Sequence, residues 1–198
     1  MDKKEALEII KKDGFELKNL PVAFLKDKKF ILEAVQIDYF ALAYAHDLLK
    51  KDKKFILEVI KKVPEALTFA DKSLKKSKRF ILDAVKQGSD GDLLDFIDKK
   101  FKKDREVVLE AVKQDCEAFA ISQTIFRKDK EIILEAIKQD GNLLEYVAQS
   151  YKKNKEIVLI AVKQNSNALR YAHKSLMKDK EIVLEAVKQD PHALEDLE

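Results

Sequence analysis

The sequence contains very little of several residues that shape protein folds. Its 198 residues include one cysteine, three prolines, four glycines and no tryptophan. The single cysteine, Cys116, excludes an internal disulfide framework and any zinc or iron–sulfur site built from several cysteines. So little glycine and proline argues against turn-rich all-β folds, glycine-rich phosphate loops and flexible linkers. No apolar run approaches the length that spans a bilayer.

What remains is a chain rich in helix-forming and charged residues. Hydrophobic residues make up 46% and charged residues 38%, with 39 Lys and Arg against 36 Asp and Glu. The net charge of +3 is too small to indicate nucleic-acid binding by itself. The N-terminus enters an amphipathic pattern directly and has no signal-peptide core. We therefore expect a soluble, helical, cytoplasmic protein, and secretion without a cleavable signal stays open.

Nearly identical segments recur along the chain. Residues 27–35 (DKKFILEAV), 129–137 (DKEIILEAI) and 179–187 (DKEIVLEAV) are almost the same text. Aligning the leading polar residue, which we number position 0, gives eight repeats that begin at Asp2, Asp27, Asp52, Ser77, Asp104, Asp129, Asn154 and Asp179. Successive starts are 25 residues apart except after Ser77, where the spacing is 27 and the repeat contains Gly88-Ser-Asp-Gly-Asp92. Such a period is typical of a helical solenoid.

Each repeat is predicted to form two short helices. The first begins with Asp, Asn or Ser, which cap helix N-termini, and carries apolar residues at positions 3, 4, 5, 7 and 8. The second carries helical spacing such as Ala41-Leu42-x-Tyr44-Ala45 with Leu49. Two such helices bury no core alone, so neighbouring repeats must stack. The predicted fold is all-α, a single solenoid domain over residues 1–198 of about eight helix–turn–helix repeats.

The repeat also resembles a known family. The motif Asp-Lys-Glu-(Ile/Val)-(Ile/Val)-Leu-Glu-Ala-Val-Lys-Gln-Asp-Gly, followed by Ala-Leu-x-Tyr-Ala, is similar to the helical tandem repeat known as domain of unknown function 4116. The resemblance covers essentially the whole chain and is strongest from Lys103 onward. It implies tandem paired helices and no assigned chemistry. Departures are Val63-Pro64, where the motif has Asp-Gly, and residues 15–21, a degenerate second helix.

No group of residues has the spacing of a catalytic or metal site. His46 and His173 share a repeat position but lie five repeats apart, about 45 Å at the usual helix spacing. His192 is near neither of them, and no histidine falls within the repeat of Cys116 or an adjacent one. Residues 89–92 faintly resemble a calcium loop but lack its closing Glu. We predict a protein that is not an enzyme and uses no metal and no cofactor.

The first candidate binding surface is a basic rim at the junctions between repeats. Residues 1–100 hold 22 Lys and Arg against 18 Asp and Glu, whereas residues 101–198 hold 17 against 18. The rim consists of Lys26, Lys29, Lys50, Lys51, Lys54, Lys75, Lys76, Lys78, Arg79, Lys102, Lys103 and Arg105. It fits a phosphate backbone or an acidic partner. The alternative is that these cations only complement helix C-termini and keep the rim soluble.

The second candidate surface is the exposed face of the second helices. Exposed first-helix positions are monotonous, whereas two positions of the second helix differ from repeat to repeat. The predicted contact residues are Ala43, His46, Thr68, Asp71, Asp95, Asp98, Gln123, Glu145, Arg170 and His173. Varied residues on a uniform scaffold suit recognition of a partner, and the alternative is that these positions are merely unconstrained.

The leading hypothesis is a non-catalytic helical-repeat scaffold that binds a protein partner through its second-helix face, away from membranes. The alternatives are a solenoid that binds nucleic acid or an acidic partner through the basic rim, and a spacer segment of a larger multidomain protein. The partner's identity and the oligomeric state stay open.

Overall fold

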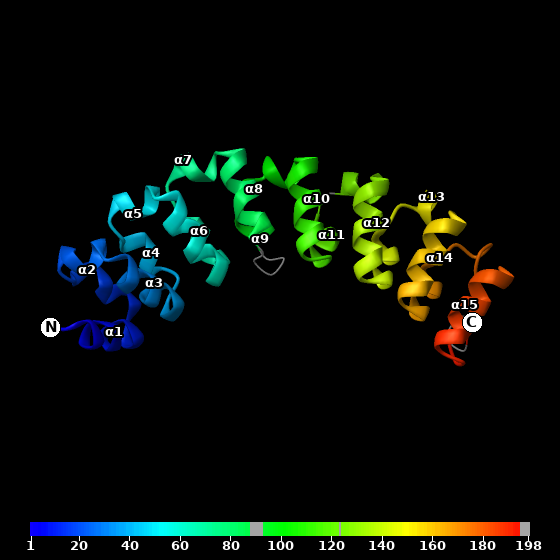
Figure 1. Ribbon diagram of the computed structural model, residues 1–198, viewed down its shortest axis with the longest axis horizontal. Coiled ribbons are helices and arrows are strands. Elements are labelled where there is room, and N and C mark those ends of the chain that lie inside the picture. The colour runs from blue at the N-terminus through cyan, green and yellow to red at the C-terminus, as the bar shows by residue number, and fades with distance from the viewer. Residues whose placement is uncertain (88–92, 123, 195–198) are drawn as a thin grey trace. The chain divides into compact units, whose positions relative to one another are not determined.

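The regular structure of this chain is helical throughout the residues that the computed structural model describes, which are 1–87, 93–122 and 124–194 (Figure 1). No strand occurs in these ranges. The all-α helical-repeat prediction is therefore confirmed. The Ser89–Asp92 segment and Gln123 lie outside the described residues.

The chain folds as two compact units, Met1–Lys102 and Lys103–Glu198, which we call unit 1 and unit 2. The boundary precedes Asp104, the leading residue of the fifth repeat, so each unit holds four repeats. A single solenoid domain over residues 1–198 stays a prediction. Unit 1 contains α1 (Lys3–Lys12), η1 (Gly14–Asn19), α2 (Val22–Lys26), α3 (Lys28–Ile37), α4 (Ala41–Tyr44), α5 (Asp47–Lys51), α6 (Lys53–Lys62), η2 (Pro64–Phe69), α7 (Lys72–Lys75), α8 (Lys78–Lys86) and α9 (Leu93–Phe96).

Unit 2 contains α10 (Arg105–Gln114), α11 (Glu117–Ile121), η4 (Thr124–Lys128), α12 (Lys130–Gln139), η5 (Gly141–Tyr146), α13 (Gln149–Lys152), α14 (Lys155–Gln164), η6 (Ser166–Tyr171) and α15 (Lys180–Gln189). The short 3-10 helix η3 (Phe101–Lys103) lies at the boundary of the two units.

The first helix of every repeat begins where the sequence predicts. The leading Asp, Asn or Ser has extended backbone angles, and its side chain accepts a hydrogen bond from a backbone N–H of the first turn. At Asp2 the cap is reciprocal, because the Glu5 carboxylate accepts a hydrogen bond from the Asp2 N–H at 2.9 Å. These caps satisfy N–H groups that the helix itself leaves unpaired.

The second half of the repeat differs from the single helix that the sequence predicts. In the second repeat α4 and α5 are separated by Ala45 and His46, whose backbone is extended. The His46 N–H donates to the Leu25 carbonyl of the preceding repeat at 2.9 Å. The same bond joins Asp71 to Lys50, Ala148 to Arg127 and His173 to Lys152. The helix breaks because its backbone turns outward to bind the neighbouring repeat.

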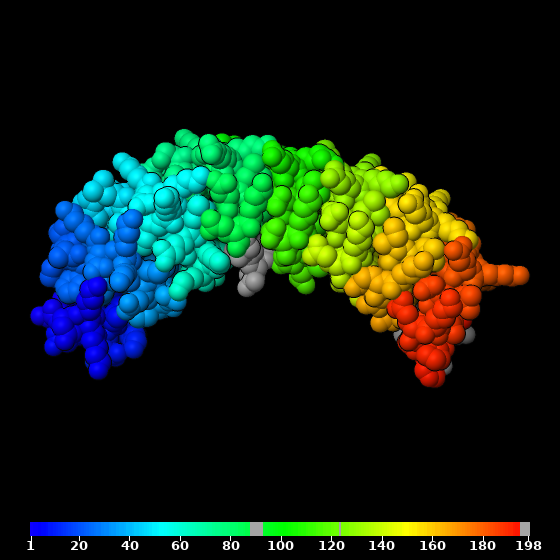
Figure 2. Space-filling model, viewed as in Figure 1, coloured from blue at the N-terminus to red at the C-terminus, as the bar shows by residue number. Residues whose placement is uncertain are grey.

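The core of each unit lies between consecutive repeats. The first helices pack in chain order, α1 on α3, α3 on α6 and α6 on α8 in unit 1, and α10 on α12, α12 on α14 and α14 on α15 in unit 2 (Figure 1). Within each unit the repeats form one packed surface without gaps between them (Figure 2). Position 3 of the first helix supplies Phe30, Phe55 and Phe80 in unit 1, all buried. Stability in such a stack comes largely from contacts between neighbours.

Candidate functional site

A ladder of ion pairs joins the first helices of neighbouring repeats. The cation at position 1 contacts the capping aspartate of the next repeat: Lys3 with Asp27 at 2.6 Å, Lys28 with Asp52 at 2.5 Å, Arg105 with Asp129 at 2.6 Å and Lys155 with Asp179 at 3.0 Å. Where the next cap is neutral, the cation reaches another acid, so Lys53 pairs with Asp83 and Lys130 with Glu156. The ladder is therefore part of the scaffold, since it uses the same repeat position throughout.

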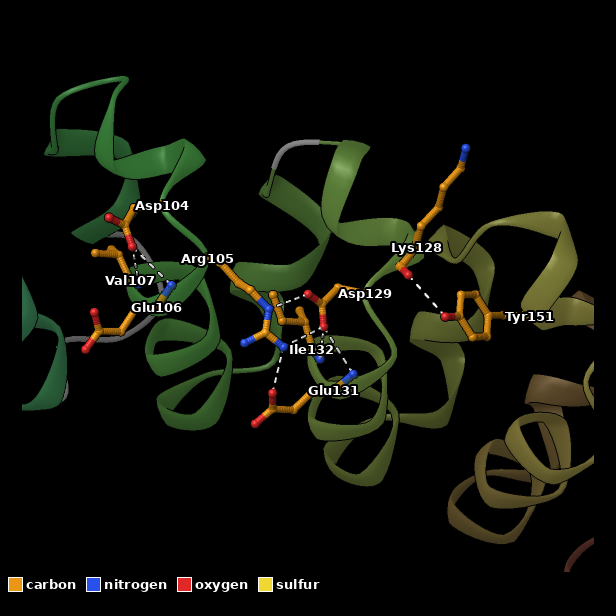
Figure 3. A network of polar contacts seen from close by, with 9 residues as sticks. All are labelled: Asp104, Arg105, Glu106, Val107, Lys128, Asp129, Glu131, Ile132 and Tyr151. Carbon is orange, nitrogen blue, oxygen red and sulfur yellow. Dashed lines mark hydrogen bonds and ion pairs between the residues drawn. The ribbon is translucent and has the colours of Figure 1, made fainter.

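The Arg105 guanidinium makes the most extensive of these contacts. It extends from α10 between Asp129, the N-cap of α12, and Glu131 in the first turn of that helix, and its Nη2 lies 2.6 Å from the Glu131 carboxylate (Figure 3). The hydrogen bond from Arg105 lowers the pKa of Asp129, with help from the backbone N–H of Ile132. A carboxyl whose pKa is lowered by folding stabilises the folded state above its ordinary titration range, and this stabilisation is lost as the pH falls toward the lowered pKa.

Replacing Arg105 with methionine is expected to raise the pKa of Asp129, because the guanidinium hydrogen bond is the largest cause of its lowering. The capping N–H groups of Glu131 and Ile132 remain in the variant and still favour the charged carboxylate, whereas burial favours the neutral acid. The measurement is an NMR titration of the Asp129 carboxyl carbon. Lys103→Met, which removes a cation from the same repeat junction, should leave that pKa unchanged. An unaltered Asp129 titration in Arg105→Met would show that the pair is absent in solution.

Several cations of the basic rim have partners within the chain. Lys50, Lys75 and Lys102 turn back along their own repeat, and each Nζ donates to the backbone carbonyl seven residues earlier, at 3.3, 2.5 and 3.3 Å respectively. Burial lowers the pKa of Lys75, so part of this side chain lies away from water. Arg105 belongs to the ladder. These side chains stabilise the ends of the short helices. They therefore agree with the alternative that rim cations complement helix C-termini.

Seven further rim cations, Lys78 not among them, have exposed side chains that make no hydrogen bond or ion pair with another described residue. In unit 1 they form what we call the basic edge: Lys26, Lys29, Lys51, Lys54, Lys76 and Arg79. Lys103 is exposed in the same way, and Lys78 is the exposed first residue of α8. Lys29, Lys54 and Arg79 lie in the first turns of first helices, where the helix dipole disfavours cations. Lys26, Lys51 and Lys76 lie at the ends of the preceding short helices, where the dipole favours them.

Position 2 of the first helix distinguishes the two units. It is basic in unit 1, where it is Lys4, Lys29, Lys54 and Arg79, and acidic in unit 2, where it is Glu106, Glu131, Glu156 and Glu181. In unit 2 three of these acids accept the position 1 cation of the preceding repeat. The same position therefore stabilises the stack in unit 2 and remains available to a partner in unit 1.

The second-helix residues fall into two groups in the structure. His46, Asp71, Asp98 and His173 cap the break in the second half of the repeat, where each side chain accepts a hydrogen bond from the backbone N–H two residues later. Their variation is thus partly limited to residues that can cap. Thr68, Asp95, Glu145 and Arg170 are exposed on the short helices, and Ala43 is half-buried. Asp95 also lies 3.4 Å from the Lys102 ammonium.

The residues considered for chemistry remain apart or are engaged otherwise. Among the described residues, no three His, Cys, Asp or Glu side chains are grouped so as to hold a metal ion. Burial raises the pKa of the Cys116 thiol, which disfavours the nucleophilic thiolate. His46 and His173 act as caps through Nδ1.

Two features were not predicted from the sequence. The first is a glutamine bridge in unit 2, where position 10 side chains donate to the preceding repeat: Gln139 to the Val112 carbonyl at 2.7 Å, Gln164 to Gln139 at 2.6 Å and Gln189 to Val162 at 2.8 Å. The Lys-Gln pair that recurs at the ends of the first helices is the sequence feature that could have indicated this bridge. The second is an exposed group of aromatic rings in unit 1. The sequence feature that could have indicated it is that aromatic residues directly follow the first helix only in the first two repeats.

No helix within the described residues has both the length and the apolar character needed to cross a membrane. The cytoplasmic location expected from the sequence stays a prediction.

Comparison with known proteins identifies one family. The model of a domain of unknown function, DUF4116, matches residues 2–50, 52–90, 88–122, 129–177 and 154–198, and two of these ranges, 2–50 and 129–177, each cover two repeats. Searches of curated proteins and of solved structures found no match. Because the matches extend over most of the chain, this protein belongs to the DUF4116 family.

Proposed function

We propose that this chain is a non-catalytic helical-repeat module that binds a protein partner through the exposed face of its second-half helices. The observation that carries the proposal is that structural positions and variable exposed positions are separate within the repeat. Polar groups that recur at fixed positions cap helices or join neighbouring repeats, whereas Thr68, Asp95, Glu145 and Arg170 differ at one exposed position.

Recognition of a protein suits this arrangement because the variable positions recur once per repeat on a rigid stack. A partner that lies along a unit meets one such residue from each repeat, and the identity of these residues then determines specificity. Catalysis has no comparable support, since the side chains that could react serve as caps or are scattered along the chain.

A second candidate function is supported by the basic edge of unit 1. The side chains of its cations make no hydrogen bond or ion pair with a described residue, whereas the corresponding positions of unit 2 include acids that form ion pairs. This contrast favours an anionic partner for unit 1, either an acidic protein surface or a nucleic acid.

A pair of substitutions on the second-helix face is expected to abolish partner capture. Thr68→Lys with Glu145→Lys changes one exposed residue in each unit, and the charge change should repel a partner selected for the native surface. The measurement is recovery of partners from a lysate on the immobilised full chain, quantified by mass spectrometry. Glu58→Lys with Gln114→Lys adds the same charge to exposed first-helix positions and should leave capture intact. Circular dichroism should show the same melting for all variants.

The same assay tests the basic edge. If capture survives Thr68→Lys with Glu145→Lys but is lost in Lys29→Glu with Lys54→Glu and Arg79→Glu, the edge rather than the face is the binding surface. Titration with labelled single-stranded and duplex oligonucleotides then identifies the class of partner, because binding to phosphates weakens steeply with salt. Absence of oligonucleotide binding at low salt would leave only an acidic protein.

A further inference from the structure

Three cations of the basic edge stand where the helices themselves disfavour them. Lys29, Lys54 and Arg79 occupy position 2, in the first turns of α3, α6 and α8, where the positive end of the helix dipole repels a cation. All four repeats of unit 2 have glutamate at this position, which the dipole favours. Departures from local rules of stability are expected at functional sites. Unit 1 thus repeats, in three consecutive repeats, a residue type that its helices do not need.

The ladder of ion pairs makes these cations more unfavourable for the fold. In unit 2 the position 1 cation contacts the position 2 acid of the next repeat, as Lys155 does with Glu181 at 2.9 Å. In unit 1 the corresponding places are held by two cations, Lys28 and Lys54, and the next junction has the same pattern. Lys28 pairs with the capping Asp52 instead. Unit 1 therefore has like charges where unit 2 has an attraction between repeats.

The basic edge is positive even when every acid near it is counted as charged, including those in ion pairs. The comparison uses three equal segments of each unit, each with five residues before a leading residue and six after it: 22–33, 47–58 and 72–83 in unit 1, and 124–135, 149–160 and 174–185 in unit 2. The segments of unit 1 hold 12 Lys and Arg against 6 Asp and Glu, and those of unit 2 hold 9 against 7. The remainder of residues 1–100 holds 10 against 12. The positive charge of unit 1 is therefore concentrated at this edge.

The cations of the edge lie along one continuous surface. Their first helices are neighbours, because α3 packs on α6 and α6 on α8 (Figure 1). The ion pair of Lys28 with Asp52, at 2.5 Å, joins the starts of two of these helices. The Asp71 N–H donates to the Lys50 carbonyl at 3.0 Å and joins the short helices in the same way. Packed helices lie about 10 Å apart, so the three junctions extend over about 20 Å.

We propose that the basic edge binds duplex nucleic acid through its phosphates, without reading the base sequence. A duplex carries one phosphate per about 1.7 Å of its axis, so a length of about 20 Å presents about twelve phosphates. Six cations along one side of the duplex can meet about half of them. Five of the six are lysines, whose ammonium groups bind phosphate as point charges. The inference rests on the second candidate function, an anionic partner for unit 1, and names the class of that partner.

Other anionic partners fit this surface less well. Interfaces between proteins have a centre from which charged residues are depleted, whereas the position 3 residues Phe30, Phe55 and Phe80 behind the edge are buried. Val22 and Leu48 are the only large apolar side chains exposed in the three segments, one in each of two repeats. Proteins that bind single strands stack the bases on aromatic side chains, and no exposed aromatic residue occurs in these segments.

The test is fluorescence anisotropy of a labelled 20-base-pair DNA duplex titrated with the full chain at several salt concentrations. We expect the duplex to bind more tightly than a single strand of the same length, and two unrelated duplex sequences to bind equally. Affinity should fall by about a thousandfold between about 50 and 200 mM salt, as six phosphate contacts predict. Lys29→Gln with Lys54→Gln and Arg79→Gln should lower the slope of log affinity against log salt by about three.

A matched variant controls for the loss of charge. Lys61→Gln with Lys62→Gln and Lys86→Gln removes three exposed lysines of the same unit, but from the opposite ends of the first helices. This variant should keep the salt slope of the native chain. Equal loss of slope in the two variants would show that binding follows the overall charge and not the basic edge, and would contradict the inference.

Charge reversal separates binding from folding. Lys29→Glu with Lys54→Glu and Arg79→Glu should abolish duplex binding, because the row then alternates in sign. The same variant should unfold at an equal or higher urea concentration than the native chain, since glutamate suits the first turn and reproduces the residue of unit 2. A lower unfolding midpoint would mean that these cations stabilise the fold, and it would remove the reason to assign them to a partner.

Two further results would overturn the inference. One is absence of duplex binding at low salt, and the other is tighter binding of the single strand than of the duplex. If no duplex binds but capture of a protein from a nuclease-treated lysate is lost in the charge-reversal variant, the partner is an acidic protein. The second candidate function then stands and only this inference fails. Neither result bears on the second-helix face, which Thr68→Lys with Glu145→Lys tests separately.

Discussion

Replacing Phe55 with alanine is expected to lower the free energy of unfolding by about 3–5 kcal/mol, the usual cost of truncating a buried phenylalanine. The side chain is 2% exposed and lies on α6, which packs against both α3 and α8. Truncation therefore leaves a cavity in the core of a helix that packs on both neighbouring repeats.

The measurement is urea unfolding followed by circular dichroism, with hydrogen exchange to locate the loss. Glu58→Ala is the matched control, because Glu58 is on the same helix and exposed, and it should change stability by less than about 0.5 kcal/mol. Exchange should accelerate in unit 1 more than in unit 2, since repeats stabilise mainly their neighbours. A loss below about 1 kcal/mol would mean that the repeats collapse around the missing ring.

The parts of the fold that could be predicted depend on local sequence. Asp27 and its counterparts begin helices because an aspartate side chain satisfies the N–H groups of the next turn, an interaction that spans three residues. Phe55 is expected in the core because apolar spacing defines one face of the helix. Both effects repeat every 25 residues, so the repeat register makes them visible without any knowledge of tertiary structure.

The break in the second half of the repeat depends instead on a distant residue. Ala45 and His46 leave the helix where the His46 N–H binds the Leu25 carbonyl, 21 residues earlier in the chain. Helical spacing continues through the break, from Leu42 to Leu49, and so predicts one helix. The sequence pattern records which side chains are buried, but a backbone hydrogen bond between repeats leaves no trace in it.

The candidate surfaces could be predicted only in part, because side-chain contacts with distant residues also leave no trace in the sequence. Sequence indicates that Lys50 and Lys51 are both cations at a repeat junction, but only the structure shows that Lys50 turns back to Ala43 whereas Lys51 faces solvent. The direction of a long side chain depends on which carbonyls remain unpaired nearby. The exposed aromatic rings of unit 1 could be anticipated from the departure of Phe15 and Tyr39-Phe40 from the repeat pattern, but the contacts of Tyr39 and Phe40 with Phe69 depend on stacking.

Replacing Gly141 with alanine is expected to destabilise unit 2 by about 1–3 kcal/mol, the cost of forcing an extra group into a packed contact. A Cβ at this position would lie 2.2 Å from the Ala161 carbonyl oxygen and 3.0 Å from its carbonyl carbon. Because these are backbone atoms of α14, the helix itself must move. The movement would also stretch the hydrogen bond from the Gly141 N–H to Gln164, which is 2.6 Å long.

Gly14→Ala provides the matched control for Gly141→Ala, because the same backbone change meets a different obstacle. Its Cβ would lie nearest the Asp38 side chain, at 1.9 Å from Oδ2, and that side chain can move at the cost of the hydrogen bond that it accepts from the Phe40 N–H. Alanine also restricts the unfolded chain, so Gly14→Ala should stay within about 1 kcal/mol of the native protein. Urea unfolding of both variants is the measurement. Equal stability of the two would show that α14 yields freely, whereas a larger loss for Gly141→Ala would show that close backbone packing between η5 and α14 holds unit 2 together.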